Sequence, residues 1–193
     1  MQKSEKKRSL LFNVLILIIL IVINSLVARF GVIAYKVGPG VSALYLSVAF
    51  MIAFTLWFGA WGMIAAYLGC AIGAGLGYVP LGVNLYWSLA DLWQVLIPIL
   101  AFKTLHADIG LRTKRDFFIF IVFGWILNNL IGAAWGTSSL AIGGITTWEK
   151  VPGMFMGWFV GNLIVTIAIT PILLRYITPN FKKAGILVKK YWV

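Results

Sequence analysis

Acidic side chains, histidine and cysteine are scarce in this sequence. Its 193 residues include five Asp and Glu, one His and one Cys, against 16 Lys and Arg. A single cysteine, Cys70, excludes a disulfide within the chain, and its glycine-rich surroundings indicate a small packing residue. The one histidine, His106, stands in a polar stretch without a second His or Cys, so we predict no metal site there. We expect neither a metal nor a cofactor.

These shortages also argue against an enzyme. General acid–base and nucleophilic catalysis need a reactive side chain within hydrogen-bonding reach of a second polar group. The hydrophobic segments hold a single acidic residue, Asp91, and Cys70 has no base beside it in the sequence. The glycines of CAIGAGLGY lack the preceding strand and the lysine of a phosphate-binding loop. We therefore predict no catalytic residues.

Apolar residues are abundant instead. They make up 62% of the chain, charged residues make up 11%, and the mean hydropathy is +0.98. Several segments contain about 18 or more mostly apolar residues, the length at which a helix spans a bilayer. The sequence therefore predicts an all-α polytopic membrane protein in the cell membrane, with no room for a second soluble domain.

The apolar runs predict a bundle of about six transmembrane helices within residues 10–176. A basic tail, 1–9, precedes the bundle, and a basic, partly aromatic tail, 177–193, follows it as an interfacial segment would. The small residues of 132–144 leave open whether this part is helical or re-entrant. The predicted helices cover 10–30, 41–58, 62–77, 85–105, a segment that begins near residue 117, and 154–176.

The basic residues indicate how the bundle is oriented. Thirteen of the 16 Lys and Arg fall on one side of the six-helix arrangement, in both tails and around the loop between the fourth and fifth helices. The positive-inside rule makes this side cytoplasmic, and both termini with it. The lipid bilayer accounts for the net charge of +11, so we predict no nucleic-acid partner.

Asp91 stands within a predicted transmembrane helix, where an ionised side chain costs roughly 2.5–3.5 kcal/mol on insertion scales. Such a residue usually faces the interior of a bundle or a wet cavity. At about 1.5 Å per helical residue, Asn24, Asn128 and Asn162 reach the depth of Asp91, in the outer third of the membrane. Gln94 lies one turn further in. The sequence thus places polar side chains of four predicted helices at one depth in the membrane, which we call the polar level.

Two hypotheses account for this polar level. One is a structural network of hydrogen bonds between helices. The other is an outward-facing ligand cavity with aromatic walls, in which Arg29 is the counter-ion of Asp91. The walls would come from Trp87, Trp93, Trp125, Trp135 and Trp158. The candidate ligand-binding residues are Asp91, Gln94, Asn24, Arg29, Asn128, Asn129, Asn162, Trp87 and Trp135.

Small residues recur at four-residue spacing in the third predicted helix. They are Ala65, Gly69, Gly73 and Gly77. A stripe of this kind lets a second helix approach closely. The second helix can belong to this chain, or the stripe can be the docking face for a partner protein.

Four segments carry a resemblance to a known family: GPGVSALYLSVAFMIAFTLWFGAWGMIAAYLG, SLADLWQVLIPILAFKTL, LRTKRDFFIFIVF and MGWFVGNLIVTIAITPILL. Over residues 39–175 the chain resembles the MASE1 family of integral membrane sensory domains. That family typically has an acid at the position of Asn162. The resemblance implies a membrane sensor that precedes a histidine kinase or a cyclic-dinucleotide output domain. Since the sequence contains no such domain, it also implies a partner signalling protein.

A second resemblance is carried by WFGAWGMIAAYLGCAIGAG together with the chain length and the predicted topology. These features are similar to the S components of energy-coupling-factor vitamin transporters. This resemblance implies a small-molecule ligand bound in the outer leaflet and transporter subunits as partners. A third alternative is a structural membrane subunit that binds no ligand.

Overall fold

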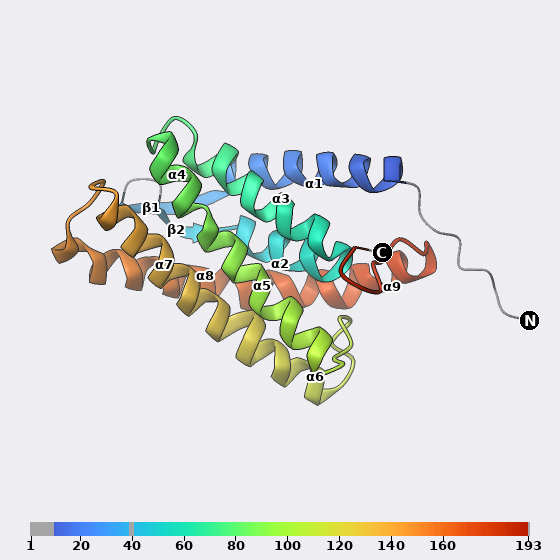
Figure 1. The fold of residues 1–193 in the computed structure, drawn as a ribbon. Helices are drawn as coiled ribbons and strands as arrows, with labels where there is room; N and C mark the ends of the chain where they lie inside the picture. Colours follow the sequence, from blue (N-terminus) through green and yellow to red (C-terminus); the bar gives the residue numbers. More distant parts are fainter. Residues whose placement is uncertain (1–9, 39–40, 193) are drawn as a thin grey trace, which may run out of the picture.

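The computed structural model describes residues 10–38 and 41–192, most of which belong to helices that run along one long axis (Figure 1). Four described helices are long and apolar enough to cross a membrane, and they pack into a helical bundle as the sequence predicts in outline. Two shorter apolar helices, Ser47–Phe58 and Ala60–Gly75, follow the first of them. The four long helices are Leu10–Phe30, Leu81–Thr104, Lys114–Ile142 and Trp148–Lys183.

Helix α1 (Leu10–Phe30) has the predicted bounds and lies at the side of the bundle. It packs against α3 (Ala60–Cys70). Its other faces expose apolar side chains, among them Leu15, Ile18 and Val22. A membrane would cover these faces, because lipid tails are as apolar as the side chains themselves.

Helix α2 (Ser47–Phe58) lies at the centre, and all its residues except Phe50 are buried. A helix that is apolar all round is stable only where its neighbours or lipid cover every face. Gly59 then reverses the chain with a φ of +62°, a conformation that favours glycine. Helix α3 follows and ends in one wider, π-helical turn, η1 (Ala71–Gly75).

The predicted second helix begins later than expected. It was predicted from residue 41, but the chain first forms an antiparallel hairpin of β1 (Val32–Gly38) and β2 (Val41–Tyr45), and α2 begins at Ser47. Valine and tyrosine on both sides of the Gly-Pro-Gly sequence favour strands over helix. Because β2 packs against α8 (Val151–Ile172), the hairpin brings Tyr45 into the bundle.

The fourth predicted helix begins earlier than expected. Residues 81–84 were predicted as a loop, but α4 (Leu81–Trp87) starts directly after Pro80 and passes through Ser88 into α5 (Leu89–Thr104). Asp91 is therefore ten residues from the start of its helix, on the order of 15 Å. This places it near the middle of the helix, further from the helix start than the six residues that the sequence predicted.

The fifth helix settles the ambiguity over 132–144. Helix α6 (Lys114–Ile119), the π-helical η2 (Phe120–Leu127) and α7 (Asn128–Ile142) form one continuous span. The segment is helical as far as Ile142 and does not re-enter. Its glycines allow close contact with α5 and α8, which explains the local abundance of small residues.

The last helix is longer than predicted. A short turn, η3 (Trp148–Lys150), leads into α8, which continues through η4 (Leu173–Ile177) and α9 (Thr178–Lys183), whereas the prediction ended at residue 176. Pro171 lacks the N–H that an α-helix needs, and the wider turn η4 follows it.

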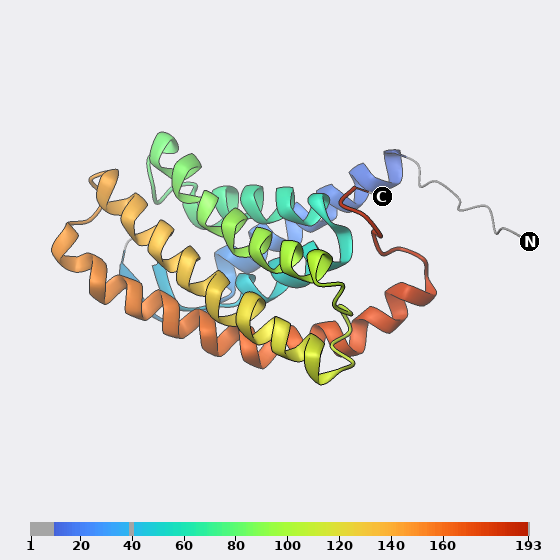
Figure 2. The same cartoon turned by 60° about the horizontal axis from the view of Figure 1, so that its bottom comes forward.

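The C-terminal segment folds back onto the bundle, as Figure 2 shows. The N–H of Val188 donates to the carbonyl of Trp57 at 2.9 Å, and the N–H of Ala60 donates to the carbonyl of Tyr191 at 2.6 Å. The ammonium of Lys103 also donates to the carbonyls of residues 189 and 190. This part of the predicted interfacial tail therefore covers the corner between α2 and α3.

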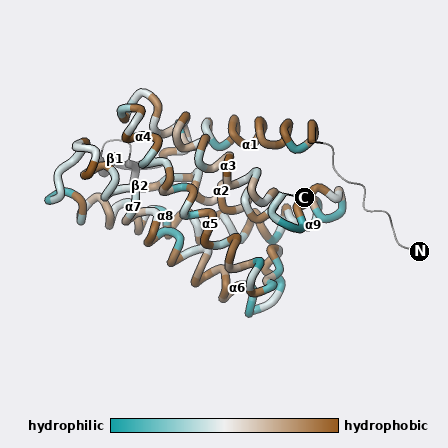
Figure 3. Tube along the Cα trace, in the orientation of Figure 1, coloured by the Kyte–Doolittle hydropathy of each residue, from teal (hydrophilic) through white to brown (hydrophobic). Residues whose placement is uncertain are grey.

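Many of the hydrophilic residues lie toward the ends of the bundle (Figure 3). The start of α1, the α5–α6 loop and α9 lie at one end, which we call the basic end (Figure 1). It holds Arg112, Arg175, Lys182 and other basic residues of 103–115 and 175–190. The basic residues of the N-terminal tail, 1–9, lie outside the described residues.

Candidate functional site

Asp91 is 1% exposed and lies inside the bundle. The hydroxyl of Tyr45 donates to its Oδ2 at 3.2 Å, and the Cys70 thiol, a weak donor, lies beside the carboxylate. Its Oδ1 is buried and makes no hydrogen bond of normal geometry with the described residues. Sequence reasoning missed Tyr45 because it lies on a strand that was predicted to be helical. Cys70, predicted only to pack, faces the carboxylate.

Gln94 connects α5 to the two last long helices. Its Nε2 donates to Oδ1 of Asn129 on α7 at 2.9 Å. The amide of Asn129 in turn donates to the carbonyl of Trp125 at 2.8 Å and to Oγ1 of Thr166 on α8 at 3.1 Å. This chain of bonds is the interhelical network that one hypothesis predicted. It leaves Oε1 of Gln94 buried and without a partner in the described part of the chain.

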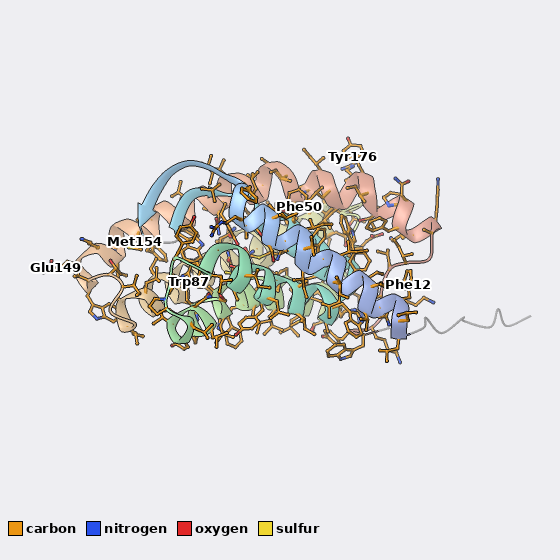
Figure 4. The ribbon with its side chains drawn as sticks, turned by 90° about the horizontal axis from the view of Figure 1, so that it is seen from above. Phe12, Phe50, Trp87, Glu149, Met154 and Tyr176 are labelled. Atoms are coloured by element: carbon orange, nitrogen blue, oxygen red, sulfur yellow. The ribbon has the colours of Figure 1, made fainter. Side chains whose placement is uncertain are left out.

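Trp87 and Trp158 form the second bridge between α4–α5 and α8. Their ring centroids lie 6.0 Å apart with the planes inclined at 70°. Gly136 of α7 lies directly against the Trp158 ring. Both indole N–H groups are buried without an acceptor among the described residues. Figure 4 shows Trp87 toward the end of the bundle that carries Glu149 and Met154, far from Phe12.

Asp91 and Asn162 occupy the turn between these two bridges. Trp87, Asp91 and Gln94 share one face of their helix, and Trp158, Asn162 and Thr166 share one face of α8, by their four- and three-residue spacings. The Trp pair lies on one side of this turn and the Gln94–Asn129–Thr166 chain on the other. Asp91 and Asn162 therefore occupy corresponding turns of the two helices.

Asn162 is fully buried, and neither its Oδ1 nor its Nδ2 has a partner among the described residues. Asn128, which precedes Asn129 in the chain, is also fully buried, and neither atom of its amide has a partner among the described residues. A buried polar group without a partner costs about 1–3 kcal/mol. The network hypothesis thus explains Gln94 and Asn129 but leaves several costly groups unexplained. We call Tyr45, Trp87, Asp91, Gln94, Asn129, Trp158, Asn162 and Thr166 the Asp91 cluster.

Asn24 and Arg29 do not join this cluster. The Asn24 amide donates to the carbonyl of Ala65 and accepts from the hydroxyl of Ser47, so it ties α1 to α2 and α3. Arg29 lies over the ring of Tyr78 at 4.6 Å and reaches the carbonyl of Leu76 at 3.4 Å. The predicted ion pair with Asp91 does not form, because α1 lies outside the bundle centre.

The other three predicted wall residues bond to or pack against groups outside the cluster. The indole of Trp135 donates to the carbonyl of Tyr86 and packs against Trp93. The indole of Trp125 donates to the carbonyl of Leu163. Of the five predicted walls, Trp87 and Trp158 pack on each other, and Trp87 lies one helical turn before Asp91.

The small-residue stripe is used within the chain. Gly69 lies against the Asn24 side chain, and Gly73 lies against the carbonyl of Ser25, so α1 covers this part of α3 and η1. Ala65 is fully buried. The intramolecular alternative is therefore the one found for these three residues, and they offer no exposed docking face. Gly77 lies beyond η1, with open space beside it.

The described residues contain no group of three His, Cys, Asp or Glu that could hold a metal ion. His106 is exposed in the loop after α5, with a φ of +51°. The cluster offers hydrogen-bond donors and acceptors instead. Comparison with known protein families, with curated proteins and with solved structures gives no match.

Proposed function

We propose that the chain is an integral membrane, MASE1-like sensory module that binds a small molecule at the Asp91 cluster and acts through a separate partner protein. The observation that carries the proposal is the set of buried, unpaired polar atoms of Asp91, Gln94 and Asn162, together with the packed rings of Trp87 and Trp158. A purely structural core would be expected to satisfy its own polar groups. A few convergent polar groups beside aromatic side chains are typical of ligand sites.

The cluster also indicates the chemistry of its ligand. Acceptors are available at Oδ1 of Asp91 and Oε1 of Gln94, and donors at the indoles of Trp87 and Trp158. A flat ring that carries N–H groups or a positive charge on one edge and acceptors on the other would match this set.

A substrate-binding subunit of a vitamin transporter is the second candidate. It is favoured by the alternation of helix direction from α1 to α8 and by the concentration of basic residues at one end (Figure 1). This candidate cannot dock its transporter partner on the small-residue stripe, because other residues of the chain already cover Ala65, Gly69 and Gly73.

Partner identification separates the two candidates. The tagged full chain would be purified from its native membrane, and its co-purifying proteins identified by mass spectrometry. A histidine kinase or a cyclic-dinucleotide enzyme, matched by gene neighbourhood, supports the sensor. An ATPase with a coupling subunit, or retention of a vitamin-like molecule, would replace it with the uptake candidate. If the chain co-purifies with neither a signalling enzyme nor transporter subunits and retains no ligand, the result would favour a structural membrane subunit.

The proposed orientation makes a separate prediction. A fluorescent protein that matures only in the cytoplasm, fused to the C-terminus, should fluoresce, because the basic end would face the cytoplasm. A phosphatase that is active only outside the cell should be inactive at the same position. The reverse result would overturn the proposed orientation of the C-terminus.

A further inference from the structure

Two adjoining hollows lie at the basic end, between the α5–α6 loop and the last helix. The first, of about 250 Å³, is bordered by Arg112, Arg175 and Lys182. The second, of about 360 Å³, shares Arg112 and Arg175 and adds Lys114. Loop and helix thus bring four cationic side chains, from distant parts of the sequence, around one concave surface.

The acidic groups nearby leave positive charge unpaired. Lys182 donates to the carboxylate of Asp108 at 3.0 Å, while Nε of Arg112 lies 3.8 Å from it. Partial burial opposes ionisation of Asp108, but the N–H of Gly110 and the Lys182 ammonium hold its pKa below the usual value. Within the described residues, Arg175 and Lys114 have no ion pair.

Asp116 does not neutralise the remaining cations. Its Oδ2 accepts hydrogen bonds from the N–H and the hydroxyl of Thr113, and its Oδ1 accepts one from the N–H of Asp108. Its charge is therefore engaged in capping α6 and fixing the loop. The cations that face the hollows remain available to an anion.

The second hollow also has an apolar side, formed by Leu111, Phe117 and Pro171. It lies where two of the long apolar helices reach the basic end, since Lys114 begins one span and Arg175 follows Pro171 in the other. The exposed rings of Phe118 and Tyr176 stand on the same two helices, next in sequence to Phe117 and Arg175 of the hollow. Aromatic side chains concentrate where membrane hydrocarbon meets the headgroups.

We propose that these hollows bind the headgroup phosphate of an anionic phospholipid, with Arg112 and Arg175 as its main ligands and the Phe117 side against the upper acyl chain. Guanidinium groups match phosphate oxygens in a two-pronged geometry. A basic pocket between transmembrane helices is the arrangement that holds anionic headgroups. The apolar side favours a lipid over a free phosphate.

The experiment titrates the purified full chain, in detergent, with phosphatidylglycerol or phosphatidylcholine and counts bound lipids by native mass spectrometry. Each removed positive charge should weaken phosphatidylglycerol binding about five-fold, so Arg112→Gln with Arg175→Gln should weaken it about 25-fold. Phosphatidylcholine binding should be weak in every variant. The matched control, Lys183→Gln with Lys190→Gln, removes the same charge outside the two hollows and should change binding less than about two-fold.

An Arg-to-Lys variant and two lipid-free phosphate compounds provide further tests of the lipid site. Arg112→Lys with Arg175→Lys keeps the charge but loses the planar fork, and should bind between the wild type and the Gln variant. Inorganic phosphate and glycerol phosphate, added without lipid, should not protect the protein against heat. Equal losses in the Gln variant and its control, or equal protection by free phosphate, would overturn the lipid site.

Discussion

Replacing Gly136 by alanine should destabilise the protein, although the same change inside an exposed helix is normally stabilising. A Cβ at this position would lie 2.3 Å from Cη2 and 2.4 Å from Cζ3 of Trp158. The Trp158 ring is itself held against Trp87, so it has little freedom to retreat. Overpacking of this kind costs about 1–3 kcal/mol. Thermal unfolding in detergent should therefore show a lower midpoint.

The matched control for this change is Gly153→Ala, at the start of α8. A Cβ there would meet nothing within 4 Å, so the unfolding temperature should stay the same or rise slightly. Displacement of Trp158 should also alter tryptophan fluorescence in the Gly136 variant alone. An unchanged midpoint and spectrum for Gly136→Ala would mean that the Trp158 ring is not held as described.

Asp91→Asn should separate function from stability. The change removes an ionisable group from the middle of a membrane helix, where a charge is costly, so the unfolding temperature should be retained or raised. Ligand response should fall, because hydrogen bonds to a charged partner contribute about 1.5–3 kcal/mol. That range corresponds to roughly 10- to 150-fold in affinity.

The comparison variant for Asp91→Asn is Asp108→Asn, which removes the same charge from the loop at the basic end. It should bind the small-molecule ligand like the wild type and lose some thermal stability, since Lys182 and the N–H of Gly110 lose a charged acceptor. Equal, wild-type-like ligand responses from both variants would reject a functional carboxylate within the bundle.

The sequence predicted those parts of the fold that depend on long apolar runs. The run that forms α1 is continuous and bounded by charge, and its ends were found at residues 10 and 30. The hairpin at 32–45 was missed because its strands are short and the second leads directly into an apolar helix. That one error concealed Tyr45, the hydrogen-bond partner of Asp91.

Rotation around each helix axis limited the prediction of the site. Depth alone grouped Asn24 with Asp91, but Asn24 faces Gly69 and Ser47 instead. Arg29 was assigned to Asp91 by charge, yet it lies outside on Tyr78. Asp91, Gln94 and Asn162 come from long helices of the bundle, and Gln94 bonds to Asn129 rather than to Asn128, which the depth argument named. The glycines of these helices, 132 and 136, were the local sign of close approach.

The most direct test of the ligand site is to denature the purified full chain and identify the small molecules that it releases, by mass spectrometry with quantification. We expect about one molecule per chain from the wild type, with N–H groups or a positive charge on a flat ring, and little or none from Asp91→Asn. Wild-type protein that releases no such molecule, or equal release from both proteins, would contradict a ligand site at Asp91.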